Sequence, residues 1–115
     1  MKKMHKMKLY SLPFQKIKNG SKDIELRLYD EKRRVIKVDD EIVFLDFENE
    51  KQTITAKVVA VHIFPTAKEL YDNFSDKTRL GYDIGDVVDP NDIAEFYSKE
   101  REEKYGVVGI EIKLI

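Results

Sequence analysis

The segment 53–64 constrains the fold most, because its apolar side chains recur at every second position, as in a β-strand. The two faces of this strand are expected to carry Val59, Val61 and Ile63 on one side and Val58 and Ala60 on the other. Residues 41–47 are apolar on both faces, as in a central strand, and the polar residues 48–51 form the expected turn. Together these segments predict a β-hairpin over 41–64.

The rest of the chain alternates between short strand and helix patterns. Strands are predicted at 7–10, 24–29 and 107–115, and helices at 12–18, 67–74 and 90–105. Ser11, Thr66 and Asp89 are the expected N-caps of these helices, and residues 30–40 are polar with one helical turn. The order β-α-β-β-β-α-α-β predicts an α+β fold, with a small curled sheet or mixed β-barrel flanked by short helices.

Length and composition limit the classes of function that the chain can have. We expect a single domain over residues 1–115. The 21 basic and 22 acidic residues give a net charge of −1, which argues against a protein whose whole surface binds nucleic acid. Two basic runs remain as local patches, although such runs are usually solvated surface. The first run contains Lys2, Lys3, Lys6 and Lys8, and the second contains Lys32, Arg33, Arg34 and Lys37.

The same composition bears on compartment and cofactors. The chain has no cysteine, so disulfides and thiolate metal sites are excluded. No apolar run is long enough for a membrane span, and we expect a cytoplasmic protein. His5 and His62 lack the spacing of metal ligands, so no metal site and no cofactor are predicted. The patterns carry no signal for the oligomeric state.

Residues 20–27, Gly-Ser-Lys-Asp-Ile-Glu-Leu-Arg, form the most informative stretch for function. On the predicted strand Glu25 and Arg27 share a polar face, and the glycine turn can direct Lys22 toward it. Three converging ionisable groups could hold a phosphate, polarise a carbonyl or shuttle a proton. They could equally form a surface ion pair of about 0–1 kcal/mol beside a solvated lysine.

This octet and its context resemble the ASCH domain, a family of the PUA-like superfamily. Residues 20–27 match the family pattern G-x-K-x-x-E-x-R, and residues 105–110 match the opening of its last strand. Asp39-Asp40 stand where the family usually has a glycine-aspartate pair, a difference that bears on turn geometry. The resemblance covers nearly the whole chain.

The resemblance implies a PUA-like pseudo-barrel with a ligand cleft at the motif. Its partner would be RNA or a nucleotide-like small molecule, held by Lys22, Glu25 and Arg27. A second reading is a small hydrolase of RNA or of a modified nucleoside, with Lys22 and Glu25 as the catalytic pair. Relatives that hydrolyse N4-acetylcytidine have a threonine where this chain has Glu25. A third reading is a scaffold in which the motif only ties the first helix to the sheet.

Aromatic side chains near such a cleft could stack on a base. Tyr82, in the glycine-bearing loop between the last two helices, is the best placed and is predicted to bind ligand. Phe14, Phe96 and Tyr97 fall on the buried stripes of their helices and are predicted to be core residues. Tyr29 shares the polar strand face with Arg27.

Overall fold

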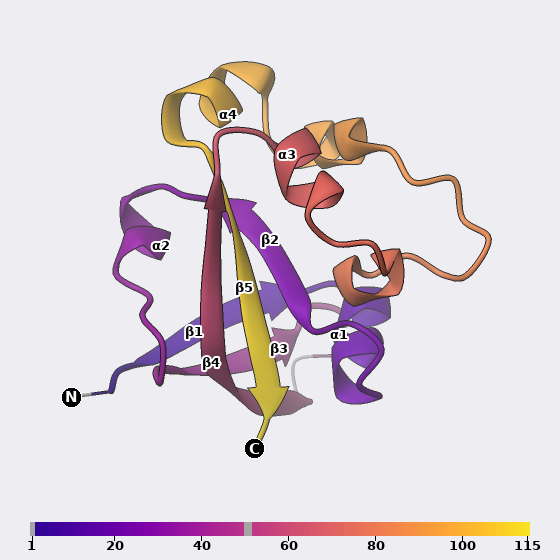
Figure 1. The fold of residues 1–115 in the computed structure, drawn as a ribbon. Helices are drawn as coiled ribbons and strands as arrows, with labels where there is room; N and C mark the ends of the chain where they lie inside the picture. Colours follow the sequence, from indigo (N-terminus) through magenta and orange to yellow (C-terminus); the bar gives the residue numbers. More distant parts are fainter. Residues whose placement is uncertain (1, 50–51) are drawn as a thin grey trace.

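The computed structural model describes residues 2–49 and 52–115 and has the predicted α+β architecture (Figure 1). The five strands are β1 (Met4–Leu9), β2 (Ile24–Leu28), β3 (Glu41–Asp46), β4 (Thr53–Phe64) and β5 (Val107–Leu114). The α-helices are α1 (Ser11–Lys18), α2 (Glu31–Arg34), α3 (Ala67–Asp72) and α4 (Lys99–Tyr105), with 3-10 helices η1 (Lys77–Leu80) and η2 (Pro90–Glu95). The predicted turn at 48–51 lies partly outside the described residues.

The strands form one mixed sheet in the order β1-β3-β4-β5-β2. The β1–β3 pair is parallel, and the other pairs are antiparallel. The sheet curls until its two edge strands meet. Their contact is a hydrogen bond in which Nη2 of Arg27 on β2 donates to the carbonyl oxygen of Lys8 on β1 at 3.1 Å. This contact leaves a half-barrel whose seam runs between β1 and β2.

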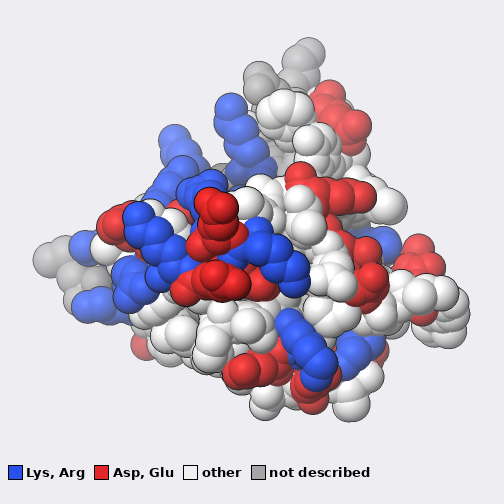
Figure 2. Space-filling view, turned by 90° about the horizontal axis from the view of Figure 1, so that it is seen from above, with Lys and Arg blue, Asp and Glu red and all other residues white. Residues whose placement is uncertain are grey.

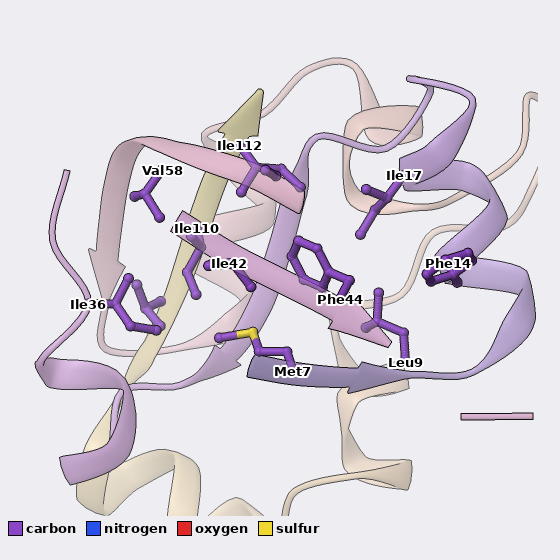
Figure 3. Packing of buried hydrophobic residues seen from close by; sticks show 12 residues of the cluster. Met7, Leu9, Phe14, Ile17, Ile36, Ile42, Phe44, Val58, Ile110 and Ile112 are labelled. Carbon is purple, nitrogen blue, oxygen red and sulfur yellow. The ribbon is translucent and has the colours of Figure 1, made fainter. Parts of the chain in front are cut away.

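Two apolar clusters stabilise the half-barrel. The first fills the inside of the curl, where side chains from β1, β3, β4, β5 and α1 interlock (Figure 3). Phe14 and Ile17 cover it from α1 and are fully buried, as predicted for that helix face. The second cluster packs α3 on Ile24 and Val107 of the neighbouring strands. The described helices lack the length and apolar character needed to cross a membrane.

A β-bulge in β4 changes the predicted alternation of its side chains. The pairing with β5 shifts between Val58 and Ala60, which leaves Val59 as the extra, exposed residue. Val58 and Val61 therefore pack on the same cluster, and the predicted faces, with Val59, Val61 and Ile63 together, were wrong. Strict period-two reasoning cannot detect an inserted residue.

The predicted helix over 90–105 is two shorter elements. The 3-10 helix η2 ends at Glu95, and α4 starts only at Lys99. Ser98 lies in extended conformation, and its side-chain oxygen accepts the backbone N–H of Arg101, so it starts a new helix as an N-cap. Asp89 caps η2 as predicted, with Pro90 at its first position.

Ser11 does not cap the first helix as predicted. It lies inside α1, and the cap position is Tyr10, which makes no side-chain cap hydrogen bond. The hydroxyl of Ser11 instead donates to Oδ1 of buried Asp46 at 2.6 Å. This bond ties the start of α1 to the end of β3.

Asp39 occupies the backbone conformation that favours glycine, with φ of +79°. We expect Asp39→Gly to leave the free energy of unfolding unchanged or raise it, because glycine removes the left-handed strain and only the exposed Asp39–Lys57 ion pair is lost. Asp39→Val should lower it by about 1–2 kcal/mol. Urea denaturation of both variants checks this, and equal stability of the two would contradict it.

Candidate functional site

A pocket of about 340 Å³ opens at the seam between β1 and β2. The residues that line it are Lys8, Leu9, Tyr10, Pro13, Lys22, Glu25, Leu26, Arg27, Phe47, Ile93, Phe96 and Tyr97. Of its four charged members, Lys22, Glu25 and Arg27 are largely buried and form the floor, whereas Lys8 is exposed. Exposed aromatic side chains form the rim. The pocket is thus apolar at its mouth and ionic at its base.

Lys22 lies at the floor because the chain turns at Gly20, with φ of +88°, just before β2. Its ammonium donates to the carbonyl oxygens of Ile24 at 2.7 Å and Leu80 at 3.0 Å, and lies 3.2 Å from Oε1 of Glu25. An ammonium has three N–H donors, so these contacts occupy all of them. Lys22 therefore holds η1 against β2 and positions Glu25.

Glu25 lies between two cations on the polar face of β2. Oε1 faces the Lys22 ammonium, and Oε2 accepts from Nε of Arg27 at 2.9 Å. Burial acts to raise the pKa of the Glu25 carboxyl, but the charges and hydrogen bonds of Lys22 and Arg27 outweigh it and lower the pKa below its ordinary value. Glu25 is therefore an ionised hydrogen-bond acceptor at neutral pH.

Arg27 is the most accessible charge of the floor. Burial acts to lower the pKa of its guanidinium, but Glu25 and the neighbouring Tyr97 raise it, so the group keeps its charge. Its side chain is 16% exposed, and one edge is bound to Glu25 and to the Lys8 carbonyl. Arg27 also lines the pocket, where a guanidinium can contact a phosphate or a carbonyl oxygen.

Tyr10, Phe47 and Phe96 form the aromatic rim. The Tyr10 ring meets Phe47 edge-on at 5.5 Å between centroids and lies 6.4 Å from Phe96. Tyr10 and Phe47 directly follow β1 and β3, which end side by side because Leu9 pairs with Asp46. Each ring is more than half exposed, so a planar ligand can reach it.

The structure brings together three of the four predicted site residues. Lys22, Glu25 and Arg27 meet at one floor, but Tyr82 lines a neighbouring shallow depression, which shares only Ile93 and Phe96 with the pocket. The Tyr82 hydroxyl donates to Oδ2 of Asp92 at 2.6 Å and lies 3.0 Å from the Tyr71 hydroxyl. The ligand-binding roles of these residues stay predictions.

Two of the aromatic residues predicted to be core line the pocket instead. Phe14 is core as predicted, whereas Phe96 is 61% exposed and Tyr97 is half-buried, so their assignment to the core was wrong. Both line the pocket because the chain leaves its helical path between η2 and α4. Tyr29 packs on the first cluster, with the Arg34 guanidinium 4.4 Å above its ring.

The donor set at the pocket does not resemble a metal site. Within residues 2–49 and 52–115, no three His, Asp or Glu side chains cluster closely enough to hold a metal ion. Glu25 is the single carboxylate of the lining, and its two neighbours are cations. The arrangement offers one ionised acceptor between two cations, and the lowered pKa of Glu25 reduces its strength as a general base.

A family model of the ASCH domain matches residues 7–115. The chain belongs to the ASCH domain family. This ASCH chain is similar to the crystal structure of hypothetical protein PH0355, with 36% identity, a TM-score of 0.78, and coverage of 98% of this chain and 99% of that one. It is also similar to protein PF0455 from Pyrococcus furiosus, with 34% identity, a TM-score of 0.72 and 97% of both chains covered.

A more distant ASCH structure shows the fold alone. The ASCH protein from Zymomonas mobilis is 14% identical, with a TM-score of 0.58 over 94% of this chain and 65% of that one. Its similarity and the curled mixed sheet confirm the expected PUA-like architecture of the ASCH domain. The ASCH family is suggested to bind RNA. No curated protein matches the sequence.

Proposed function

We propose that this ASCH domain binds single-stranded RNA or a nucleotide by taking one base into the pocket above Glu25 and Arg27. The observation that carries this proposal is an ionised, buried carboxylate and a guanidinium beneath three exposed aromatic rings. Small-molecule sites commonly have volumes of about 300–1,000 Å³, and this pocket, at about 340 Å³, falls at the lower end.

Each part of the pocket has a role in this proposal. A base stacked on a rim aromatic gains about 1–3 kcal/mol. The Glu25 carboxylate accepts a hydrogen bond from an amino group on the base edge, as carboxylates do from cytosine. Arg27 contacts the adjoining phosphate, and Lys22 contributes indirectly by holding Glu25. Tyr82 would join the site only through a ligand that extends beyond the pocket toward its depression.

Phe96→Ala should weaken binding of a labelled RNA octamer roughly 5- to 100-fold at low salt, because it removes a stacking surface. Fluorescence anisotropy measures the dissociation constant. The control is Ile84→Ala, which removes a 96% exposed apolar side chain that does not line the pocket. Absence of RNA and nucleotide binding by the unmodified protein, or equal affinity of both variants and the unmodified protein, would refute the proposal.

The hydrolase alternative has less support from the contacts. Lys22 has no N–H left to activate a leaving group, and the lowered pKa of Glu25 weakens it as a general base. We therefore expect no turnover of N4-acetylcytidine or RNA by the purified protein. Release of acetate from N4-acetylcytidine, lost in a Glu25→Gln variant that circular dichroism shows to be folded, would establish the hydrolase instead.

A further inference from the structure

A second, larger cavity adjoins the pocket. It has a volume of about 620 Å³ and lies between β1, β3 and α2. We call it the basic groove, and its lining residues are His5, Lys6, Met7, Lys8, Arg27, Lys32, Arg33, Ile36, Val43, Leu45 and Thr53. Five of them are Lys or Arg, and none of these described lining residues is Asp or Glu.

The groove gathers charge from both basic runs of the sequence. Lys6 and Lys8 point outward from the same face of β1, and Lys32 comes from α2. These three lysines make no side-chain hydrogen bond or ion pair with another described residue, whereas Arg27 is paired with Glu25 and Arg33 with Asp30. Lys and Arg side chains also gather on the side of α2 and the N-terminus in the view from above (Figure 2).

Arg33 adds an independent observation in favour of an anion at the groove. Nη1 of its guanidinium binds Oδ2 of Asp30 at 3.0 Å, but its buried Nε has no hydrogen-bond partner among the described residues. A buried donor without an acceptor destabilises the fold. Arg33 lines the groove, so a rotation of its side chain that exposed Nε there would let a phosphate oxygen satisfy this donor.

The groove and the pocket adjoin each other at the seam. Both are lined by Lys8 and Arg27, and Arg27 donates to the Lys8 carbonyl oxygen between them. Along β1, the exposed residues Lys6 and Lys8 lead to Tyr10 at the rim, about 13 Å away for four residues of extended chain. Cationic side chains thus lead directly into the base pocket.

We infer that the basic groove binds the phosphate backbone of a single-stranded oligonucleotide while one of its bases occupies the pocket. The inference rests on the proposed function and narrows its ligand from a free nucleotide to a nucleic-acid strand. The flanking phosphates lie along Lys6, Lys8 and Lys32 and cross into the pocket at Arg27. Such a groove follows the backbone without reading sequence, as in other single-strand binders.

The test compares a mononucleotide with an RNA octamer on a groove variant. In Lys6→Gln/Lys32→Gln, octamer affinity at 0.05 M salt should fall roughly five- to tenfold for each lysine. The slope of log affinity against log salt should become shallower by about 0.7 per lost phosphate contact. Binding of the mononucleotide should not change. The control is Lys68→Gln/Lys113→Gln, which removes the same charge from exposed positions outside both cavities.

The possible results distinguish the groove inference from the proposed role of the pocket. If the octamer binds no more tightly than the mononucleotide, or if groove and control variants behave alike, the groove inference is wrong and the base pocket stands. If the octamer binds through the groove lysines but Phe96→Ala has no effect, the groove stands and the proposed pocket fails. If neither ligand binds the unmodified protein, both are wrong.

Discussion

Glu25→Gln should lower the free energy of unfolding by about 3–5 kcal/mol. The substitution keeps the size of the side chain but leaves the Lys22 ammonium and the Arg27 guanidinium buried without their shared counter-charge. Removing the partner of a buried ion lowers stability far more than removing the partner of an exposed ion, which costs about 0–1 kcal/mol. Urea denaturation followed by circular dichroism gives the value.

Two controls separate a lost charge pair from a general effect. Glu103→Gln, at an exposed position of α4, should change stability by less than about 0.5 kcal/mol. Lys22→Met combined with Glu25→Gln should destabilise less than the sum of the single changes, because the orphaned ammonium is also removed. Additive losses in this cycle would show that Lys22 and Glu25 do not act as a pair.

Glu25 also makes the free energy of unfolding depend on pH. The pKa of Glu25 is lower in the folded protein than in the unfolded chain, where it is about 4.3. The unfolded state therefore binds the proton more readily, and the stability contributed by Glu25 is present above that value and is lost as the pH falls below it. The stability difference between the unmodified protein and Glu25→Gln should be full at pH 6–8 and shrink below about pH 4.

Gly106→Ala should destabilise the domain by about 3 kcal/mol or more. Gly106 joins α4 to β5 with φ of +71° and ψ of −172°, a region that is essentially restricted to glycine and costs other residues about 1–3 kcal/mol. An added Cβ would also lie 2.9 Å from the backbone carbonyl oxygen of Phe64, which cannot move without disturbing β4. Thermal and urea denaturation measure the loss.

Gly20→Ala is the matched control for the steric part of this effect. Gly20 also has a positive φ, of +88°, but a Cβ added there would meet no atom within 4 Å. We expect a loss of about 1–2 kcal/mol there, from backbone strain alone. Equal losses at the two glycines would show that the contact with Phe64 contributes nothing.

Local patterns predicted the strands and the charged floor because both depend on near neighbours. The alternation of residues 24–28 separates Ile24 and Leu26 from Glu25 and Arg27, and the structure keeps that division. Asp39 was recognised as a glycine-like position from the resemblance, and its φ of +79° gives the physical reason.

The aromatic rim could not be predicted, because it depends on long-range register. Tyr10 and Phe47 become neighbours only through the parallel pairing of β1 with β3, which no local pattern encodes. Phe96 was assigned to the core because a helical period continues through residues 93–97, and the interruption before Ser98 reverses that assignment. The signal that could have been used was an aromatic residue at the end of each of two predicted strands, Tyr10 in 7–10 and Phe47 in 41–47.

The pairing of β2 with β5 has a consequence for synthesis of the protein. Arg27 lies opposite Val108, so the strand that carries the charged floor gains its hydrogen-bonded partner about 80 residues later in the chain. At typical elongation rates of about 5–20 residues per second, that interval lasts roughly 4–16 s. Until β5 leaves the ribosome and pairs with β2, Glu25 and Arg27 have no assembled pocket around them, so the proposed ligand site should form only late in synthesis.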